Sequence, residues 1–389
     1  MISNSSTTMN FNSIIINIVL LSIISCNLIQ QSLSLQYSNT NNEEQKSNGK
    51  YFPMLMPDVR PMQPETYLCT AFKMSRYEHE FIVEYLPNAT KQTAHHILIY
   101  GCQIPGYYER DTPRAVWDCG EMTFANNHNH NHNNNQDGYD SDELDFFPRG
   151  PVCKGESQIV YSWAMDAPAL KLPKGVGFKV GHGSDINYLV LQVHYAHVHR
   201  FRNGDTDHSG ITLRMLPQDT QEIDRLAGVL LLATGGMIQS HSLDYFDSAC
   251  RMNENIIIHP FAFRTHTHKL GKVVTGYRID RNNNHQWQLI GKGNPQLPQM
   301  FYPIHEKISI RPGDMVVARC TMYNNQSHPV QIGSTGDDEM CNFYIMYYVE
   351  RMDHNLKKKI CFTVGPPNFY WETILQVPRQ VTEETEKFP

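Results

Sequence analysis

Short apolar runs, separated by Gly, Pro and Asn, follow one another along the chain from about residue 50 onward. The runs are rich in Val, Ile, Tyr and Phe, and no long segment shows helical periodicity, which is typical of strands and turns. The predicted strands are EFIVEYL (80–86), AHHILIY (94–100), SQIVYSWA (157–164), GVGFKV (175–180), YLVLQVHY (188–195), SGITLRML (209–216), GVLLLA (228–233), NIIIHPFAFR (255–264), KVVTGYRI (272–279), HQWQLIG (285–291), DMVVARC (314–320) and NFYIMYYVE (342–350). Such a chain is predicted to be all-β, with two tandem antiparallel β-sandwiches of the jelly-roll kind.

The length of 389 residues agrees with two domains, at roughly 150 residues per domain. The polar stretch LPQDTQEID (216–224) marks the predicted join, which gives an N-terminal domain over 51–218 and a C-terminal domain over 219–378, followed by a tail, 379–389. Residues 126–145 are rich in Asn and polar, and are predicted to be a loop insertion in the first domain.

The N-terminus carries the apolar stretch IIINIVLLSII (14–24), too short to span a bilayer comfortably and placed where a secretory signal peptide belongs. Residues 1–34 are therefore predicted to be a signal peptide, with an uncleaved anchor as the alternative, and 35–50 a disordered linker. No later stretch is apolar enough for a stable membrane insertion.

The charge and the cysteine content limit the possible partners and the cellular compartment of the protein. The net charge of −6 and the lack of long basic runs exclude a nucleic-acid footprint, so the expected partner is a small molecule or a peptide. One of the nine cysteines, Cys26, lies beside the apolar leader, and the remaining even number is typical of disulfides in a secreted or secretory-granule protein. Asn88 and Asn325 begin N-glycosylation triplets.

Histidines gather in three places that suggest chemistry. In RTHTHKLG (264–271), alternation along an extended strand puts Arg264, His266 and His268 on one face, which is a chelating arrangement. His95 and His96 are adjacent, so they share a metal only through different ring nitrogens or a distorted backbone. The alternative is one core histidine beside one exposed histidine.

The strand 188–195 places Gln192 and His194 on one face, and the segment DDEMCNFYIMYY places Met340, Asn342 and Tyr344 on one face. Two histidines with a thioether form a soft, incomplete ligand set that suits copper, particularly Cu(I), and suits zinc poorly.

At this point the chain resembles a known family. TAHHILIYGC, LPKGVGFKVG, VLQVHYA, RTHTHKLGKVVTGYR, NPQLPQMFYP and DEMCNFYIMYY are similar to motifs of the peptidylglycine α-hydroxylating monooxygenases, which belong to the copper type II, ascorbate-dependent monooxygenases. The resemblance runs from about residue 56 to about residue 370, with the motifs in family order. These enzymes catalyse the first step of peptide C-terminal amidation.

The resemblance implies two copper ions, one in each domain. His95, His96 and His194 match the ligands of the electron-relay copper, with His95 binding through Nδ1, and Tyr67 matches a position near it. The ligands of the second copper, where substrate is oxidised, are matched by His266, His268 and Met340. Arg264, Asn342 and Tyr344 match residues that hold the peptide carboxylate, and Gln192 matches a further residue of the cleft.

The resemblance also implies the disulfides Cys69–Cys119, Cys102–Cys153, Cys250–Cys361 and Cys320–Cys341. A further bridge of the family is absent, because one of its expected positions is His208. No lyase domain follows the matched region, so we expect a separate amidating lyase to act on the product.

The predicted function is hydroxylation of the Cα of a C-terminal glycine on a peptide, with O2 as co-substrate and ascorbate as reductant. The alternatives are an amine hydroxylase of the same copper family, a non-catalytic secreted copper-binding protein and, more weakly, a zinc hydrolase. The oligomeric state is left open.

Overall fold

A computed structural model describes residues 49–107, 115–120, 147–281, 283–333 and 337–387. Residues 50–389 form one compact unit. The predicted signal peptide and the insertion at 126–145 lie outside the described residues, as does nearly all of the linker. Among the described residues, no helix has the length and apolar character needed to cross a bilayer.

The described chain is almost entirely β-strand, which confirms the predicted class. The strands are β1 (Lys50–Leu55), β2 (Thr66–Lys73), β3 (His79–Asn88), β4 (His96–Cys102), β5 (Val116–Asp118), β6 (Ser157–Ala164), β7 (Leu170–Lys171), β8 (Val176–Gly181), β9 (Tyr188–Tyr195), β10 (Gly210–Pro217), β11 (Arg225–Thr234), β12 (Met237–Ile238), β13 (Ser242–Arg251), β14 (His259–His266), β15 (Gly271–Asp280), β16 (Gln286–Gly293), β17 (Tyr302–Pro303), β18 (Met315–Asn324), β19 (Val330–Gln331), β20 (Asn342–Val349) and β21 (Ile360–Thr363). The helices are α2 (His199–Arg202), α3 (Arg379–Glu386) and the 3-10 turn η1 (Trp371–Thr373). Every predicted run overlaps a strand.

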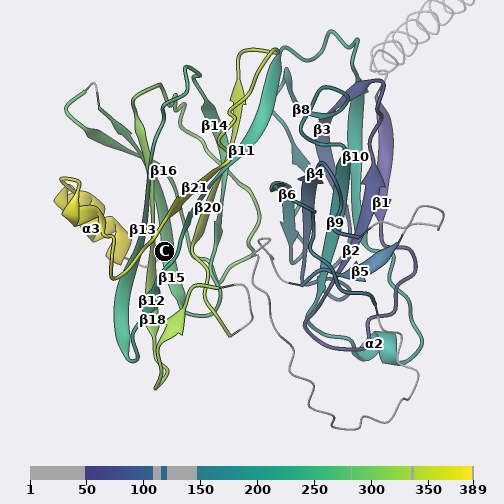
Figure 1. The fold of residues 1–389 in the computed structure, drawn as a ribbon, viewed down its shortest axis with the longest axis horizontal. Helices are drawn as coiled ribbons and strands as arrows, with labels where there is room; N and C mark the ends of the chain where they lie inside the picture. The colour runs from purple at the N-terminus through teal and green to yellow at the C-terminus, as the bar shows by residue number, and fades with distance from the viewer. Residues whose placement is uncertain (1–48, 108–114, 121–146, 282, 334–336, 388–389) are drawn as a thin grey trace, which may run out of the picture. The chain divides into compact units, whose positions relative to one another are not determined.

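The first half of the chain packs a sheet in the order β5-β2-β9-β4-β6 against the strands β1-β10-β3-β8. One hydrophobic cluster joins the two layers, with Ile97, Leu191 and Val193 from the first and Ile82 and Leu213 from the second. The pairs within both layers are antiparallel. This is the first of the two predicted sandwiches (Figure 1).

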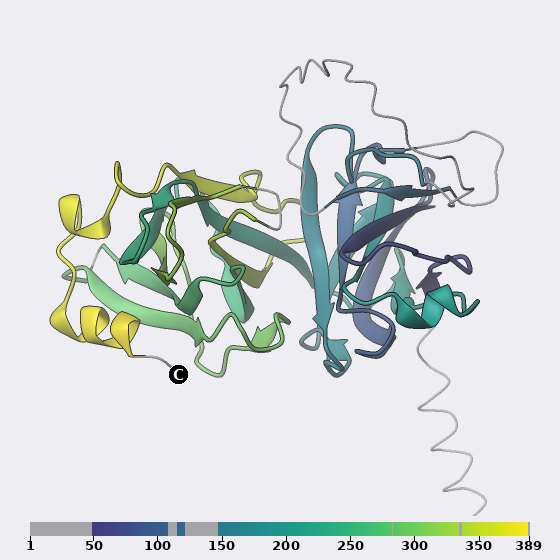
Figure 2. The same cartoon turned by 90° about the horizontal axis from the view of Figure 1, so that it is seen from below.

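The second half packs the sheet β13-β18-β15-β16 against β11-β20-β14-β17. Its core holds Phe246 and Val316 from one layer and Leu230, Phe263 and Ile345 from the other. α3 lies in a stretch predicted only as a tail. It packs on β15 and β18 (Figure 1 and Figure 2), where Val381 is buried and the hydroxyl of Tyr277 donates to Glu384 at 2.8 Å.

The two sandwiches share a sheet, which the sequence did not predict. β8 pairs in parallel with β11, through Arg225 opposite Val176 and Leu226 opposite Gly177, so that one sheet runs from β1 to β17. β21 also pairs with β11 in parallel. These two parallel pairs are exceptions to the antiparallel arrangement that was predicted.

The four disulfides implied by the family resemblance are all present. They are Cys69–Cys119, Cys102–Cys153, Cys250–Cys361 and Cys320–Cys341, with Cα–Cα distances of 5.8, 5.6, 5.9 and 5.8 Å. His208 occupies a position where the family usually has a cysteine. Its Nδ1 lies 3.8 Å from a carboxylate oxygen of Asp58.

Candidate metal centres

His95, His96 and His194, called the first group below, come together in the first sandwich. Nδ1 of His96 lies 3.4 Å from Nδ1 of His95 and 3.3 Å from Nδ1 of His194. Among the described residues these three offer ligand atoms within 4.8 Å of one another. His197 and His199, treated as bystanders at the sequence level, are outside this group, and both are exposed.

The local backbone explains how adjacent histidines converge. His95 precedes β4, and its N–H donates to the carbonyl oxygen of His194 at 2.9 Å, so it is not held in the alternation of the strand. His96 lies in β4 directly opposite His194 in β9, and facing residues of an antiparallel pair project to the same side. The distortion needed for two neighbouring histidines to share an ion is therefore present.

Burial controls the charge of these rings. Burial lowers the pKa of His95 and holds the pKa of His96 well below its ordinary value, with the neighbouring imidazoles acting in the same direction. These shifts favour the neutral ring, which is the form that offers a lone pair to a metal.

Two further predicted residues flank this group. The ring of Tyr67 in β2 stacks on the ring of His194, with centroids 4.1 Å apart and planes within 2°. Gln192 is buried on the face of His194, and its amide nitrogen donates to the carbonyl oxygen of Gly120 at 2.9 Å. Its side chain is thus tied to Gly120, and a catalytic role for it stays a prediction.

His266, His268 and Met340, called the second group below, also come together, at one end of the second sandwich. Nε2 of His266 lies 3.3 Å from Sδ of Met340, and the rings of His266 and His268 have centroids 5.5 Å apart. β14 ends at His266 and β20 begins at Asn342, so His268 and Met340 both lie just beyond strands. The extended-strand prediction therefore holds for Arg264 and His266 but not for His268.

Hydrogen bonds fix the ring nitrogens of this second group. The side-chain amide of Gln299 donates to the carbonyl oxygens of Thr267 and Pro295, so its oxygen is the atom that accepts from Nδ1 of His266. Nδ1 of His268 lies 2.8 Å from the carbonyl oxygen of Asp338. Both rings then carry their lone pair at Nε2, and burial holds the pKa of His266 well below its ordinary value.

Glu339 was not predicted, and it holds the two ends of this group together. Its buried carboxylate accepts the backbone N–H of His268 at 2.9 Å, of Leu270 at 2.6 Å and of Met340 at 3.1 Å. These bonds draw His268 out of the strand ladder and fasten it to the segment that carries Met340. Burial raises the pKa of Glu339, while these N–H groups oppose the shift.

A buried arginine lies beside the second group. Arg264 in β14 pairs with Tyr344 in β20, and His266 pairs with Asn342, so all four side chains project to one face. The guanidinium of Arg264 lies 4.8 Å over the ring of Tyr344, and its Nε donates to the carbonyl oxygen of Gln299 at 2.8 Å. Its Nη1 is buried without a hydrogen-bond partner in the described part of the chain.

The donor sets fit copper. The first consists of three imidazoles with converging nitrogens, and the second combines two imidazoles with a thioether, a soft ligand that favours Cu(I). These two sets, on two joined β-sandwiches, form the arrangement expected of the class of proteins with two redox-metal centres.

Comparison with known proteins agrees with this class. Residues 52–202 match the N-terminal domain of the copper type II ascorbate-dependent monooxygenases, and residues 225–374 match their C-terminal domain. The chain belongs to the copper type II ascorbate-dependent monooxygenase family.

Among individual relatives, the chain is 36% identical over 318 residues to peptidyl-glycine alpha-amidating monooxygenase A of Xenopus laevis, which covers 81% of this chain and 30% of that one. It is 35% identical over 300 residues to peptidylglycine alpha-amidating monooxygenase of Rattus norvegicus, covering 76% and 26%. Dopamine beta-hydroxylase of Homo sapiens is 24% identical over 341 residues, covering 82% and 49%. The chain thus spans about a third or less of the length of the amidating relatives that it matches.

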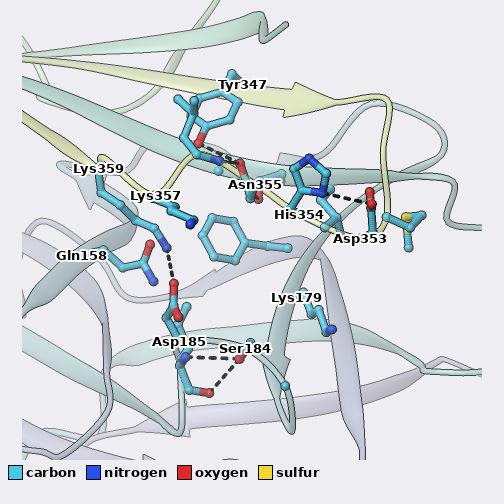
Figure 3. A pocket seen from close by; sticks show the side chains of 18 residues that line it. Gln158, Lys179, Ser184, Asp185, Tyr347, Asp353, His354, Asn355, Lys357 and Lys359 are labelled. Atoms are coloured by element: carbon cyan, nitrogen blue, oxygen red, sulfur yellow. Dashed lines mark hydrogen bonds and ion pairs between the residues drawn. The ribbon is translucent and has the colours of Figure 1, made fainter. Parts of the chain in front are cut away.

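Two cavities lie near these elements. One, of about 450 Å³, is lined by His268, His328 and Glu339 and adjoins the second group. The other, of about 160 Å³, lies where the two sandwiches meet, beside the ion pair of Lys359 and Asp185 (Figure 3). None of the predicted site residues lines this second cavity.

Proposed function

We propose that the chain hydroxylates the Cα of a C-terminal glycine on peptides, in a reaction that uses copper, ascorbate and O2 and that begins C-terminal amidation. The support comes from family membership and from amidating monooxygenases that are 35–36% identical to the chain. The match to dopamine beta-hydroxylase, at 24%, is weaker.

The observation that carries the proposal is the buried Arg264 with its unpartnered Nη1 beside His266. A guanidinium binds a carboxylate through two parallel N–H···O bonds, and such a fork fixes orientation as well as adding affinity. In the proposed complex, Arg264 holds the terminal carboxylate of the peptide, Tyr344 and Asn342 complete the contact, and the glycine Cα then faces the second metal group.

The side chains divide between two metal ions in this proposal. His95, His96 and His194 hold one copper, and His266, His268 and Met340 hold the other. The bound copper ions supply one-electron chemistry and O2 activation, with ascorbate as the reductant. The protein contributes the neutral imidazoles, the thioether and the fixed substrate orientation. Gln192, on the face of His194, is proposed as a further residue of the cleft.

The cellular setting is part of the same proposal. The protein acts outside the cytosol, secreted or in secretory granules, in agreement with its four disulfides. Its product, a peptide ending in hydroxyglycine, is passed to a separate amidating lyase. We further propose that residues 51–218 and 219–378 are the two copper domains.

Mass spectrometry of a glycine-extended peptide, after incubation with the copper-loaded protein, ascorbate and O2, tests the proposal. The expected product carries one additional oxygen atom on the terminal glycine. A peptide with a C-terminal amide and a phenethylamine serve as controls. Oxidation of the phenethylamine in preference to the peptide would favour an amine hydroxylase, and no oxygen consumption by the copper-loaded protein would favour a non-catalytic copper binder.

A further inference from the structure

Glu65 makes a contact with the first metal group that the sequence did not suggest. It lies immediately before β2, and its Oε2 is 2.8 Å from Nε2 of His194. The His194 side chain is buried, whereas that of Glu65 is 67% exposed. Of the three histidines in the group, His194 is the one with a carboxylate partner among the ion pairs of the described residues.

The backbone at Glu65 is shaped to make this contact. Glu65 has a φ of 57°, in the left-handed region that a residue with a Cβ seldom adopts and that is retained where the surrounding structure requires it. The hydroxyl of Thr66 donates to the carbonyl oxygen of Gln63 at 2.5 Å, which closes the turn. Tyr67 then lies opposite His194 in the sheet, so the turn brings the carboxylate to the edge of the His194 ring.

The contact decides which nitrogen of His194 can bind a metal. A carboxylate oxygen accepts hydrogen bonds, and Oε2 of Glu65 lies at a hydrogen-bond distance of 2.8 Å from Nε2 of His194. Nε2 of His194 must therefore carry the proton, which leaves the lone pair on Nδ1. Nδ1 is the atom that faces His96 at 3.3 Å.

We propose that Glu65 is a positioning residue of the first metal centre: its carboxylate accepts the Nε2–H of His194 and fixes the tautomer that presents Nδ1 to the metal. This inference rests on the proposed function, because it takes the three-histidine group to be a copper site. A carboxylate that orients a ligand histidine in this way also raises the basicity of the ring.

The rival explanation is that Glu65 serves only the turn, or forms a surface ion pair of little consequence. Glycine separates the two explanations, because it accepts the left-handed backbone without strain but has no carboxylate. If Glu65 matters only for the turn, Glu65→Gly leaves metal binding intact. If the carboxylate positions His194, the same substitution weakens metal binding while the fold is retained.

Asp58 provides a matched control. It too is an acidic residue with a left-handed backbone, at a φ of 51°, and it too faces a histidine, His208, at 3.8 Å. His208 belongs to neither proposed metal group. Asp58→Gly therefore repeats the change in backbone and charge without touching a proposed ligand.

The experiment uses the full chain with His268→Ala, so that the first group is the principal copper site. Cu(I) affinity is measured by competition with a chromophoric chelator, and the Cu(II) form is examined by electron paramagnetic resonance. We expect Glu65→Gly to lower the affinity by about 10- to 100-fold and to change the Cu(II) spectrum. Glu65→Gln, which keeps an accepting oxygen, should lose less, and Asp58→Gly should leave both readouts unchanged.

Unchanged affinity and an unchanged spectrum in Glu65→Gly would overturn the role of Glu65 and leave the proposed function standing. An equal loss of copper affinity in Asp58→Gly would overturn that role as well, because the loss would then follow from removing any nearby negative charge. Failure of the wild-type chain to bind copper would instead overturn the proposed function and this inference together. Thermal unfolding of each variant shows whether it is folded.

Discussion

The buried side chain of Arg264 is the strongest single argument for the proposed substrate. A buried guanidinium nitrogen without a hydrogen-bond partner is unfavourable, and Nη1 of Arg264 has no such partner among the described residues. Burial lowers the pKa of Arg264, and the influences that oppose this shift come from the phenols of Tyr344 and Tyr100. A ligand that brings its own carboxylate would give Nη1 a charged partner.

The first prediction concerns Arg264→Lys, which keeps the charge and loses the fork. A charge-assisted bond of this kind contributes about 1.5–3 kcal/mol, so kcat/KM for a glycine-extended peptide should fall by about 10- to 150-fold. Arg225→Lys is the matched control, because Arg225 also lies over a tyrosine ring, at 5.4 Å from that of Tyr348, and is remote from both histidine groups in the sheet register. An equal loss in both variants would contradict a specific role for Arg264.

The second prediction concerns Met340→His. Replacing the thioether with an imidazole removes the soft ligand that favours Cu(I), so reduction by ascorbate should slow and turnover should fall. The measurement is peptide turnover at matched copper content, together with the rate of copper reduction. Turnover equal to that of the wild-type chain at the same copper content would show that Met340 is not a ligand.

Alternation along strands was enough to predict which side chains share a face, and the pairing of Arg264 with Tyr344 and of His266 with Asn342 agrees with it. The tautomers of the histidines proposed as ligands could not be predicted in this way. They depend on Gln299 and Glu65, which reach His266 and His194 from 33 and 129 residues away. Glutamine and glutamate are common polar residues, so neither carried a signal of its own.

At the scale of elements, the strands were predicted where apolar residues run together, and three longer ones were missed. β1 and β2 lie beside polar or proline-containing segments, and β13 (SLDYFDSACR) carries Asp and Ser within the strand. In β13 these polar groups are satisfied by partners elsewhere: Asp247 is fully buried and accepts two bonds from Arg319 at 2.7 Å. A sequence pattern does not reveal such a distant partner.

The third prediction concerns the contact between the two layers of the second sandwich. Gly276 in β15 lies against the ring of Phe343 in β20, and an added Cβ would overlap that ring. Phe343 neighbours Asn342 in the strand that follows Met340, so Gly276→Ala should strain the second metal group as well as the core. We expect a loss of about 1–3 kcal/mol in the free energy of unfolding, measured by denaturant titration.

Gly150→Ala is the control for this prediction. A Cβ at Gly150 would meet its nearest atoms at 3.6 Å, an ordinary van der Waals contact, so little change is expected. Copper content at the second group should fall in Gly276→Ala and be unchanged in Gly150→Ala. Equal stability of the two variants would show that the layers can separate to admit the methyl group.

At the scale of the whole molecule, β11 is buried on both faces. Leu230 and Leu232 face the core of the second sandwich, while Val229, Leu231 and Ala233 belong to the cluster that fills the first. The run GVLLLA is apolar at consecutive positions for this reason, since a strand covered on both sides shows no alternation. Two sandwiches were predicted correctly, but a pattern of strands does not tell whether their cores touch.

The last prediction follows from this shared strand: the two sandwiches should unfold together. Leu231→Ala removes apolar contact on the face toward the first sandwich and should cost about 2–5 kcal/mol. Because β8 and β11 belong to one sheet, the loss should appear in both halves, seen as one calorimetric transition and as equal loss of hydrogen-exchange protection in β9 and β18. Two separate transitions, or a loss confined to β18, would mean that each sandwich is stable without the other, and the spacing of the two metal centres would then be free to vary.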